Sequence, residues 1–234
     1  MSGTAAAQTS MERERARPDY KKGWDFMRIE DWGNAAKSFQ QAIDTDREFE
    51  DAYYGLGSAQ MRMKKYAESI AAYVKCRDLY RAQAGKNFTN SQDAQRHRQD
   101  RLVEIDEQIR LTQTGPQSLT SQDRVRQLQD QRRQIQDYIS KGGNVSIENS
   151  VPAFVSVALG SAYFRTEQFV EAEREYKAAI AADPKKGEAY SNLAVVYLQT
   201  GRYKEADAAV RSAEKAGYKV HPQLKQDIKG KIAG

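Results

Sequence analysis

The sequence predicts an all-α protein in which helix–turn–helix units stack on one another. Two observations carry this fold class. A pattern of small and aromatic residues recurs at a fixed spacing of 34 residues, and such a period is typical of stacked supersecondary units. Glycine and proline interrupt the pattern where a helix would end. The composition agrees, because 29% charged residues and a mean hydropathy of −0.83 suit the thin core of a solenoid two helices deep.

The pattern occupies four windows, and they abut in pairs: 16–49 with 50–83, and 153–186 with 187–220. A small residue opens the pattern, an aromatic follows nine positions later, and three further core positions complete it. In window order, the opening small residues are Gly23, Gly57, Gly160 and Ala194, and the aromatic residues are Trp32, Tyr66, Phe169 and Tyr203. The first core position holds Ala35, Ser69, Ala172 and Ala206, and the second holds Phe39, Tyr73, Tyr176 and Val210. The third core position holds Ala42, Cys76, Ala179 and Ala213. We expect the first small residue where two antiparallel helices approach most closely.

Residues 1–15 are small, polar or alternately charged, so we expect a disordered N-terminal tail. The segment from Thr4 to Gln8 lacks the apolar core of a signal peptide. The Ala-Ala-Ala-Gln run is equally consistent with the remnant of a removed signal and with an ordinary start. Because no apolar run approaches 18 residues, we expect a soluble protein without a transmembrane segment, located in the cytoplasm or, if a signal was removed, in the bacterial periplasm.

Breakers place helices inside the windows. In the last window Thr200-Gly201 separates a helix of about 187–199 from one of about 203–216. In the third window residues 165–168 have the same role, and Asp183-Pro184 ends the second helix. Cys76 stands where most windows have alanine, so we interpret it as a small buried core residue.

Residues 84–152 interrupt the pattern, and their composition shifts to Gln, Arg and Asp. They contain two narrow apolar stripes at coiled-coil spacing. The stripes are Leu102, Ile105, Ile109 and Thr112, and then Val125, Leu128, Arg132, Ile135 and Ile139. Thr114-Gly115-Pro116 lies between them and Gly142-Gly143 follows. We predict an antiparallel helical hairpin of about 91–113 and 118–141. Two degenerate repeats stay open as the alternative, since the length is close to twice 34.

Residues 221–234 are predicted to form a capping helix that begins at Pro222 and turns Leu224 and Ile228 toward the array. The net charge of +5 has its excess over residues 201–234. These basic residues are dispersed and have few aromatic neighbours, so we interpret them as a solvated face and consider a nucleic-acid partner unlikely.

The sequence gives little support for catalysis. Its two histidines, His97 and His221, have no partner at metal-ligand spacing, and Cys76 is the one cysteine. The Gly55-Leu56-Gly57 run falls inside a predicted helix, where it cannot form a phosphate loop. We therefore expect a protein that is not an enzyme and has no cofactor, no metal site and no small-molecule substrate.

The repeat resembles the tetratricopeptide repeat (TPR) family. In the last window the resemblance rests on Tyr190, Leu193, Ala194, Tyr197, Gly201, Tyr203, Ala206 and Ala213. In the third it rests on Leu159, Gly160, Tyr163, Phe169, Ala172, Tyr176, Ala179 and Pro184, and in the second on Tyr53, Leu56, Gly57, Tyr66, Tyr73 and Leu79. The first window departs from the family at Lys22 and Arg47. The resemblance implies a right-handed superhelix of four repeats whose first helices line a concave groove.

That resemblance implies a binding groove for a peptide or protein segment. The candidate groove residues are Tyr20, Trp24, Met27, Arg28, Tyr54, Met61, Arg62, Phe154, Phe164, Arg165, Asn192 and Leu198. Aromatic residues, methionine and arginine are enriched at interfaces. For Trp24, Tyr54 and Phe154 the alternative of packing between neighbouring first helices stays open.

The resulting hypothesis is a non-catalytic adaptor that binds a partner in the groove and uses the hairpin as a second contact surface. The alternative is a scaffold that self-assembles through its repeats or its hairpin into a homo-oligomer. Family members that grip a C-terminal carboxylate use Lys and Asn side chains where this chain has Tyr20, Trp24 and Gly55. We therefore do not expect a carboxylate clamp.

Overall fold

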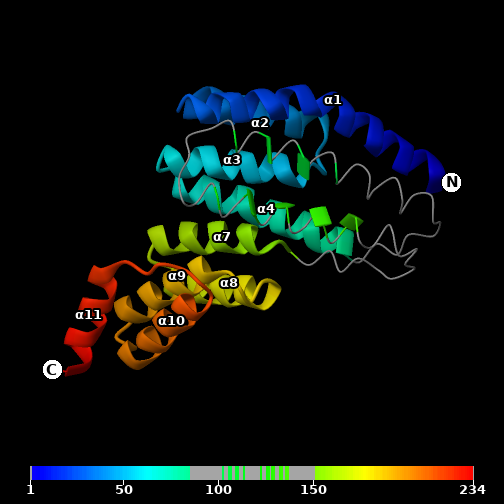
Figure 1. The fold of residues 1–234 in the computed structure, drawn as a ribbon. Coiled ribbons are helices and arrows are strands. Elements are labelled where there is room, and N and C mark those ends of the chain that lie inside the picture. The colour runs from blue at the N-terminus through cyan, green and yellow to red at the C-terminus, as the bar shows by residue number, and fades with distance from the viewer. Residues whose placement is uncertain are drawn as a thin grey trace. The chain divides into compact units, whose positions relative to one another are not determined.

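The computed structural model describes residues 2–84 and 151–233, together with individual helical residues between positions 102 and 136. Every regular element in these ranges is an α-helix, which confirms the predicted all-α class. The helices are α1 (Ser2–Arg28), α2 (Trp32–Thr45), α3 (Glu50–Arg62), α4 (Tyr66–Ala84), α7 (Ala153–Arg165), α8 (Phe169–Ala182), α9 (Gly187–Gln199), α10 (Tyr203–Lys215) and α11 (Pro222–Ala233), as Figure 1 shows. The two helices predicted for the last window match α9 and α10.

The helices belong to two compact units. The first unit comprises Met1–Asp46 and Ala84–Glu148, and the second comprises Arg47–Gln83 and Asn149–Gly234. The second unit therefore holds three of the four predicted repeats, together with α11. The predicted segment limits, 16–83 and 153–220 for the repeats, 84–152 for the insertion and 221–234 for the cap, stay predictions.

In the first unit α1 packs against α2. The rings of Trp24 and Phe39 meet edge to face with centroids 5.3 Å apart, and Tyr20 lies 6.0 Å from Phe39. The helix begins at Ser2, whereas the sequence predicted a disordered tail over residues 1–15. Tertiary contacts anchor the helix from Arg13 onward, since Arg13 forms an ion pair with the buried Asp46 and Ala16 is fully buried.

The same turn follows the first helix of every repeat. Glu30, Lys64, Glu167 and Gly201 occupy equivalent positions, and each has a left-handed backbone with φ of 62°, 61°, 60° and 74°. The next residue donates its backbone N–H to the carbonyl five positions earlier. These bonds are Asp31 to Phe26 (3.0 Å), Lys65 to Gln60 (2.9 Å), Gln168 to Tyr163 (3.0 Å) and Arg202 to Tyr197 (2.8 Å). This bond and backbone define the Schellman motif, which satisfies the carbonyls at a helix end.

Within each repeat the small residue faces the ring sixteen positions later. A Cβ added at Gly23 would lie 2.6 Å from the Phe39 ring, and one at Gly160 would lie 2.8 Å from the Tyr176 ring. Gly57 has the same relation to Tyr73, again at 2.8 Å. In the last repeat Ala194 stands for the glycine and Val210 for the ring. The extra methyl group of Ala194 on the first helix is thus matched by a smaller side chain, Val210, on the second helix.

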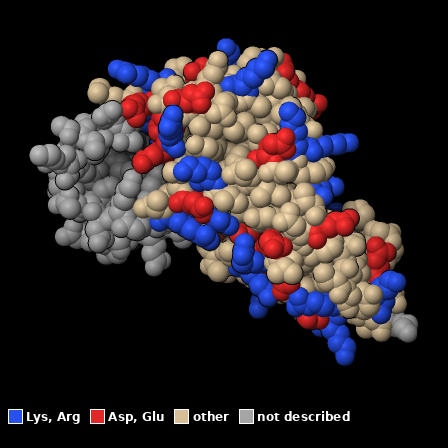
Figure 2. Space-filling model, turned by 180° about the vertical axis from the view of Figure 1, so that it is seen from behind, with Lys and Arg blue, Asp and Glu red and all other residues tan. Residues whose placement is uncertain are grey.

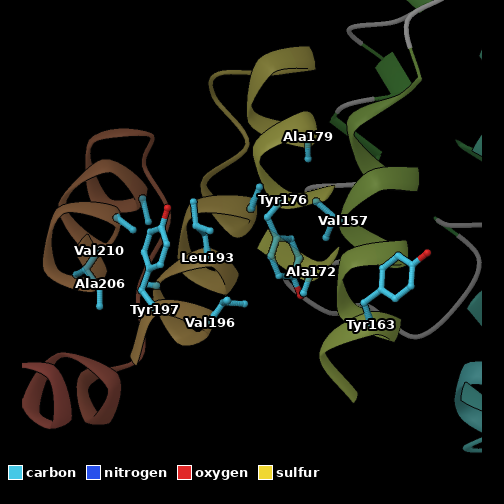
Figure 3. Close-up of a cluster of buried hydrophobic side chains, with 14 of the residues drawn as sticks. Val157, Tyr163, Ala172, Tyr176, Ala179, Leu193, Val196, Tyr197, Ala206 and Val210 are labelled. Atoms are coloured by element: carbon cyan, nitrogen blue, oxygen red, sulfur yellow. The ribbon is translucent and has the colours of Figure 1, made fainter. Parts of the chain in front are cut away.

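The core of the second unit runs through consecutive repeats. Figure 3 shows side chains from α7 to α10 converging, among them Val157, Tyr176, Leu193 and Val210. All four are buried. Because the apolar stripe of each helix pair is covered by the next pair, the units stabilise one another as the sequence predicted.

The second and third repeats pack directly on each other, although residues 85–150 separate them in the sequence. The rings of Tyr54 on α3 and Phe154 on α7 meet edge to face at 4.9 Å. Arg77 on α4 forms an ion pair of 2.8 Å with Glu175 on α8, which is almost fully buried. The array of the second unit therefore continues directly from α3 and α4 to α7 and α8.

A smaller cluster lies at the end of α4. It contains Cys76, Tyr80, Phe154 and Val155, all buried. The Tyr80 hydroxyl donates a hydrogen bond of 2.7 Å to Oδ1 of the buried Asp51, so this buried oxygen has a partner. Cys76 is fully buried, which confirms its interpretation as a core residue.

The described residues of the insertion are helical and amphipathic. Ile105 and Leu128 are buried, and every other described stripe position is half-buried. All described residues outside the stripes are exposed. Arg132, the polar stripe member, lies with its Nε 2.7 Å from Oδ1 of Asp106. The predicted stripes therefore have the expected burial, while Thr112, Ile139 and both connecting segments lie outside the described residues and the hairpin stays a prediction.

The helix α11 covers the last repeat, with Ile228 buried and Leu224 half-buried against α10 and its neighbours. The ring of His221 accepts a hydrogen bond of 3.2 Å from the backbone N–H of Gln223, so this histidine caps the helix N-terminus. His97 lies outside the described residues. Among the helices that the structure describes, none combines the length and apolar character that a bilayer crossing requires.

Candidate interaction face

The candidate site lies on the first helices of the second unit, α3, α7 and α9. α3 packs against α7, and α7 packs against α9. Positions spaced by three or four residues on each helix share one side. We call this side the first-helix face and define it by Tyr54, Ser58, Met61, Arg62, Ser161, Phe164, Arg165, Asn192, Val195, Leu198 and Gln199, all half-buried or exposed.

An apolar row crosses the first-helix face. Met61, Phe164 and Leu198 occupy equivalent positions in three consecutive repeats, and each is half-buried against the core. The centroid of the Phe164 ring lies 5.6 Å from that of the Phe169 ring. A row of partly exposed apolar side chains on rigid helices offers a partner contact area without ordering the protein first.

Two arginines border this row. Arg62 and Arg165 directly follow Met61 and Phe164, and both are exposed. They lie in the last turns of α3 and α7, where positive charge also interacts favourably with the helix dipole. In the first unit Arg28 has the equivalent place and donates a 2.9 Å hydrogen bond to Asp25.

Paired hydroxyl groups lie beneath the face. Ser161 Oγ is 3.1 Å from the Tyr176 hydroxyl, and Ser58 Oγ is 3.1 Å from the Tyr73 hydroxyl. Both serines donate to the carbonyl four residues earlier, at 2.9 Å. Because a serine has one hydrogen to donate, each tyrosine must be the donor toward its serine.

The environment of Tyr176 fixes its protonation. Burial raises the pKa of the Tyr176 hydroxyl to about 12, with the charges of Glu188 and Arg165 acting in opposite senses. The hydroxyl is therefore neutral at physiological pH. It also lies close enough to Arg165 to sense that charge.

In the second unit, α3 and α7 differ in exposed charge from the second helices. The acids of α3, Glu50 and Asp51, are buried, so the exposed charge of α3 is Arg62. The charge of α7 is Arg165 alone. The second helices instead carry both signs in pairs such as Lys177 with Glu173 (2.7 Å). Figure 2 shows Lys and Arg side chains interspersed with Asp and Glu side chains.

The structure places the twelve predicted groove residues in three burial classes. Arg28, Arg62 and Arg165 are exposed; Trp24, Met27, Tyr54, Met61, Phe164, Asn192 and Leu198 are half-buried; Tyr20 and Phe154 are buried at 4% and 7% exposure. Eight of them belong to the second unit, and seven of these eight lie on the first-helix face. Phe154 instead packs into the cluster at the end of α4.

Sequence reasoning missed the hydroxyl pairs. Their signal was a serine followed fifteen residues later by a tyrosine, which occurs at 58 and 73 and again at 161 and 176. The tyrosines counted only as core residues of the repeat. Which atom donates to which depends on side-chain geometry that the sequence does not show.

Comparison with known proteins agrees with this geometry. Two tetratricopeptide repeat family models match residues 20–83 and 163–226, and together they cover more than half of the chain. The chain therefore belongs to the tetratricopeptide repeat family. Proteins of this family are generally non-catalytic adaptors, which supports a role in protein interaction. No curated protein shows a significant sequence match.

Solved structures resemble the fold. The crystal structure of MamA aligns with a TM-score of 0.55 at 17% identity, covering 86% of this chain and 78% of MamA. PilW, a widely conserved type IV pilus biogenesis factor, aligns with a TM-score of 0.43 at 14% identity, covering 93% of this chain and 86% of PilW. A thermophilic TPR protein of Thermus thermophilus aligns with a TM-score of 0.38 at 16% identity, covering 94% of this chain and 100% of that protein. The likeness to MamA shows the TPR-type fold and nothing about partners.

Proposed function

We propose that this protein is a non-catalytic adaptor whose first-helix face binds a segment of another protein. The observation that carries the proposal is the apolar row of Met61, Phe164 and Leu198 on helices that expose almost no other charge than Arg62 and Arg165. A surface with no partner would more commonly resemble the second helices, where charges of both signs alternate.

The insertion provides a second contact surface in this proposal. Its described residues outside the stripes are polar or charged and exposed, including Arg110, Gln113, Arg126, Gln129 and Arg133. Such a surface suits a transient polar contact better than an obligate apolar one. The first-helix face would then hold the tighter contact, and the insertion would add specificity.

Affinity capture from native lysate with quantitative mass spectrometry tests the proposal. The face variant combines Arg62→Glu, Arg165→Glu and Asn192→Ala, because these side chains are exposed or half-buried and their loss leaves the core intact. The control combines Lys204→Glu and Lys215→Glu, both exposed on α10. Thermal unfolding of both variants is measured first, to establish that they are as stable as the wild type.

A protein captured by the wild type and the control but lost with the face variant supports the adaptor. Capture that is equal for all three baits contradicts binding at the first-helix face. If the protein itself is the main captured species and the face variant leaves this unchanged, self-assembly through another surface replaces the adaptor proposal.

A further inference from the structure

The junction between the second and third repeats differs from the other two repeat junctions in one pair of positions. At the other junctions this pair is an isoleucine of the earlier repeat and an alanine of the later one, Ile43 with Ala72 and Ile180 with Ala209. Ala209 is buried in the apolar core of the second unit, and Ile180 packs against that core. At the junction of the second and third repeats the equivalent residues are Arg77 and Glu175, which form an ion pair of 2.8 Å. A charged pair therefore takes the place of an apolar one where the insertion interrupts the sequence.

The carboxylate of Glu175 is incompletely satisfied at this junction. Glu175 is 1% exposed, and its Oε1 accepts a hydrogen bond of 2.8 Å from Arg77. Its Oε2 is buried and has no hydrogen-bond partner within the part of the chain that the structure describes. A buried polar atom without a partner costs free energy, and contact with water removes that cost. The closed junction therefore carries a cost that opening relieves.

Each charge of the pair also has a second partner on its own helix. Arg77 donates two hydrogen bonds of 3.1 Å, from Nε and Nη2, to Oδ1 of its neighbour Asp78. Nη2 of Arg174 lies 3.7 Å from Oε1 of Glu175, its neighbour on α8. When α4 and α8 separate, Arg77 keeps Asp78 and Glu175 stays beside Arg174. Opening therefore leaves neither charge without a nearby countercharge.

We propose that Arg77 and Glu175 form a latch through which the second and third repeats separate without unfolding of the third and fourth repeats. A buried ion pair often stabilises a protein less than apolar residues of similar volume, because both charges lose their water. Opening returns that water to the latch, whereas opening an apolar junction exposes apolar surface to water. The contact between Tyr54 and Phe154 keeps the closed junction the major state.

Opening of the latch divides the first-helix face. Met61 belongs to α3 and Phe164 to α7, so the apolar row is continuous only while this junction is closed. If the first-helix face binds a partner, that partner favours the closed junction, since a ligand stabilises the state to which it binds. This consequence rests on the proposed function, whereas the latch itself rests on the ion pair and does not depend on it.

The single cysteine of the chain reports the opening. Cys76 is fully buried, and it belongs to the cluster that also contains Phe154 and Val155 of α7. Separation of α4 from α7 exposes its thiol to solvent. When the junction recloses faster than the thiol reacts, the rate of reaction with a thiol reagent measures the equilibrium between the closed and open junction.

Reaction of Cys76 with dithionitrobenzoate under native conditions tests the latch. The full-length proteins are wild type, Arg77→Ile, Glu175→Ala and their double variant, which restores the isoleucine and alanine of the other junctions. The control, Arg211→Ile with Asp207→Ala, removes an ion pair within α10. Rates are measured at about 50 mM and about 500 mM NaCl and divided by the rate of glutathione at the same salt concentration. Urea unfolding gives the global stability of each protein.

We expect wild-type Cys76 to react faster than its global unfolding equilibrium allows, and faster still in high salt, because salt weakens the ion pair. Each single variant should react faster than the wild type, since it leaves one charge of the pair unmatched. The double variant should react at least roughly fivefold more slowly than the wild type, and its rate should not rise with salt. The control should react like the wild type.

Two results would overturn the latch. One is a wild-type rate that equals the rate set by global unfolding and does not change with salt. The other is a double variant that reacts as fast as the wild type and responds to salt in the same way. The wild-type measurement needs no substitution, so it decides the question even if the double variant fails to fold. Neither result bears on the adaptor proposal, which the capture experiment tests separately.

Discussion

At the scale of single residues, each repeat contains the same contact between a small residue of its first helix and a larger residue of its second helix. In three repeats a glycine of the first helix lies against an aromatic ring of the second helix. In the fourth, Ala194 replaces the glycine and the smaller Val210 replaces the ring. Because packed interiors tolerate volume changes only when a neighbour compensates, the two positions must be energetically coupled.

Gly160→Ala should destabilise the protein by about 1–2 kcal/mol, since overpacking against Tyr176 exceeds the gain in helix propensity. In a Tyr176→Val background the same change should be neutral or stabilising. A double-mutant cycle by urea unfolding measures this coupling. Gly230→Ala is the control, because nothing lies within 4 Å of its added Cβ and the helix should gain about 1 kcal/mol. Additive effects at positions 160 and 176 would contradict the contact.

Tyr176 should give the protein a defined alkaline sensitivity. Burial raises its pKa to about 12, above its unfolded value near 10. A raised folded pKa contributes stability that is fully present below pH 10 and lost as the pH rises toward 12, because the unfolded chain releases the proton first. The stability difference between wild type and Tyr176→Phe should shrink by about 1 kcal/mol between pH 9 and 11. A constant difference in urea unfolding across this range would contradict the buried hydroxyl.

At the scale of elements, the turn after each first helix is strained in three repeats out of four. Lys64 and Glu167 adopt a left-handed backbone that Gly201 adopts without a Cβ penalty. The Schellman bonds hold all of these turns in the same geometry. The turn is thus imposed by its surroundings in the earlier repeats and favoured locally in the last one.

Lys64→Gly and Glu167→Gly should each stabilise the protein by about 0.5–1 kcal/mol, while Gly201→Ala should destabilise it by about 1 kcal/mol. Thermal unfolding followed by circular dichroism measures all three. Destabilisation by both glycine substitutions would show that chain entropy outweighs the relief of strain at these turns.

The continuity of the second unit predicts the effect of removing the insertion. Tyr54 with Phe154 and Arg77 with Glu175 join the second repeat to the third. Deleting residues 86–148 and joining the ends through a short Gly/Ser linker should therefore leave a helical protein that unfolds cooperatively. Circular dichroism during heating tests this. Loss of a cooperative transition would favour degenerate repeats over an inserted hairpin.

The sequence predicted the helix pairs of the repeats well, and it predicted the turns and side-chain contacts less well. Small and aromatic residues such as Gly160 and Tyr176 encode a helix contact directly, so the helices of the last window were predicted closely. The turn at Glu167 carries no glycine, and its backbone had no local signal. The ion pair of Arg13 with Asp46 joins residues 33 positions apart, and the hydroxyl pairs depend on side-chain geometry, so neither had a local signal.

At the scale of the whole molecule, paired charges and the proposed binding surface lie on different helices. The second helices carry paired charges, and the first helices of the second unit present an apolar row bordered by Arg62 and Arg165. A solenoid gains stability from each neighbouring repeat, so it can leave one side of its first helices uncovered without losing its fold. We propose that this side is the one that binds a partner.

Site-specific photo-crosslinking in native lysate tests this central claim most directly. A benzoylphenylalanine is placed at Gln199 on the first-helix face and, as the control, at Val170 on α8, which is 79% exposed. We predict a covalent adduct with a segment of another protein at position 199 and none of that partner at position 170. Identical adducts at both positions, or adducts only with a second copy of this protein, would contradict the account.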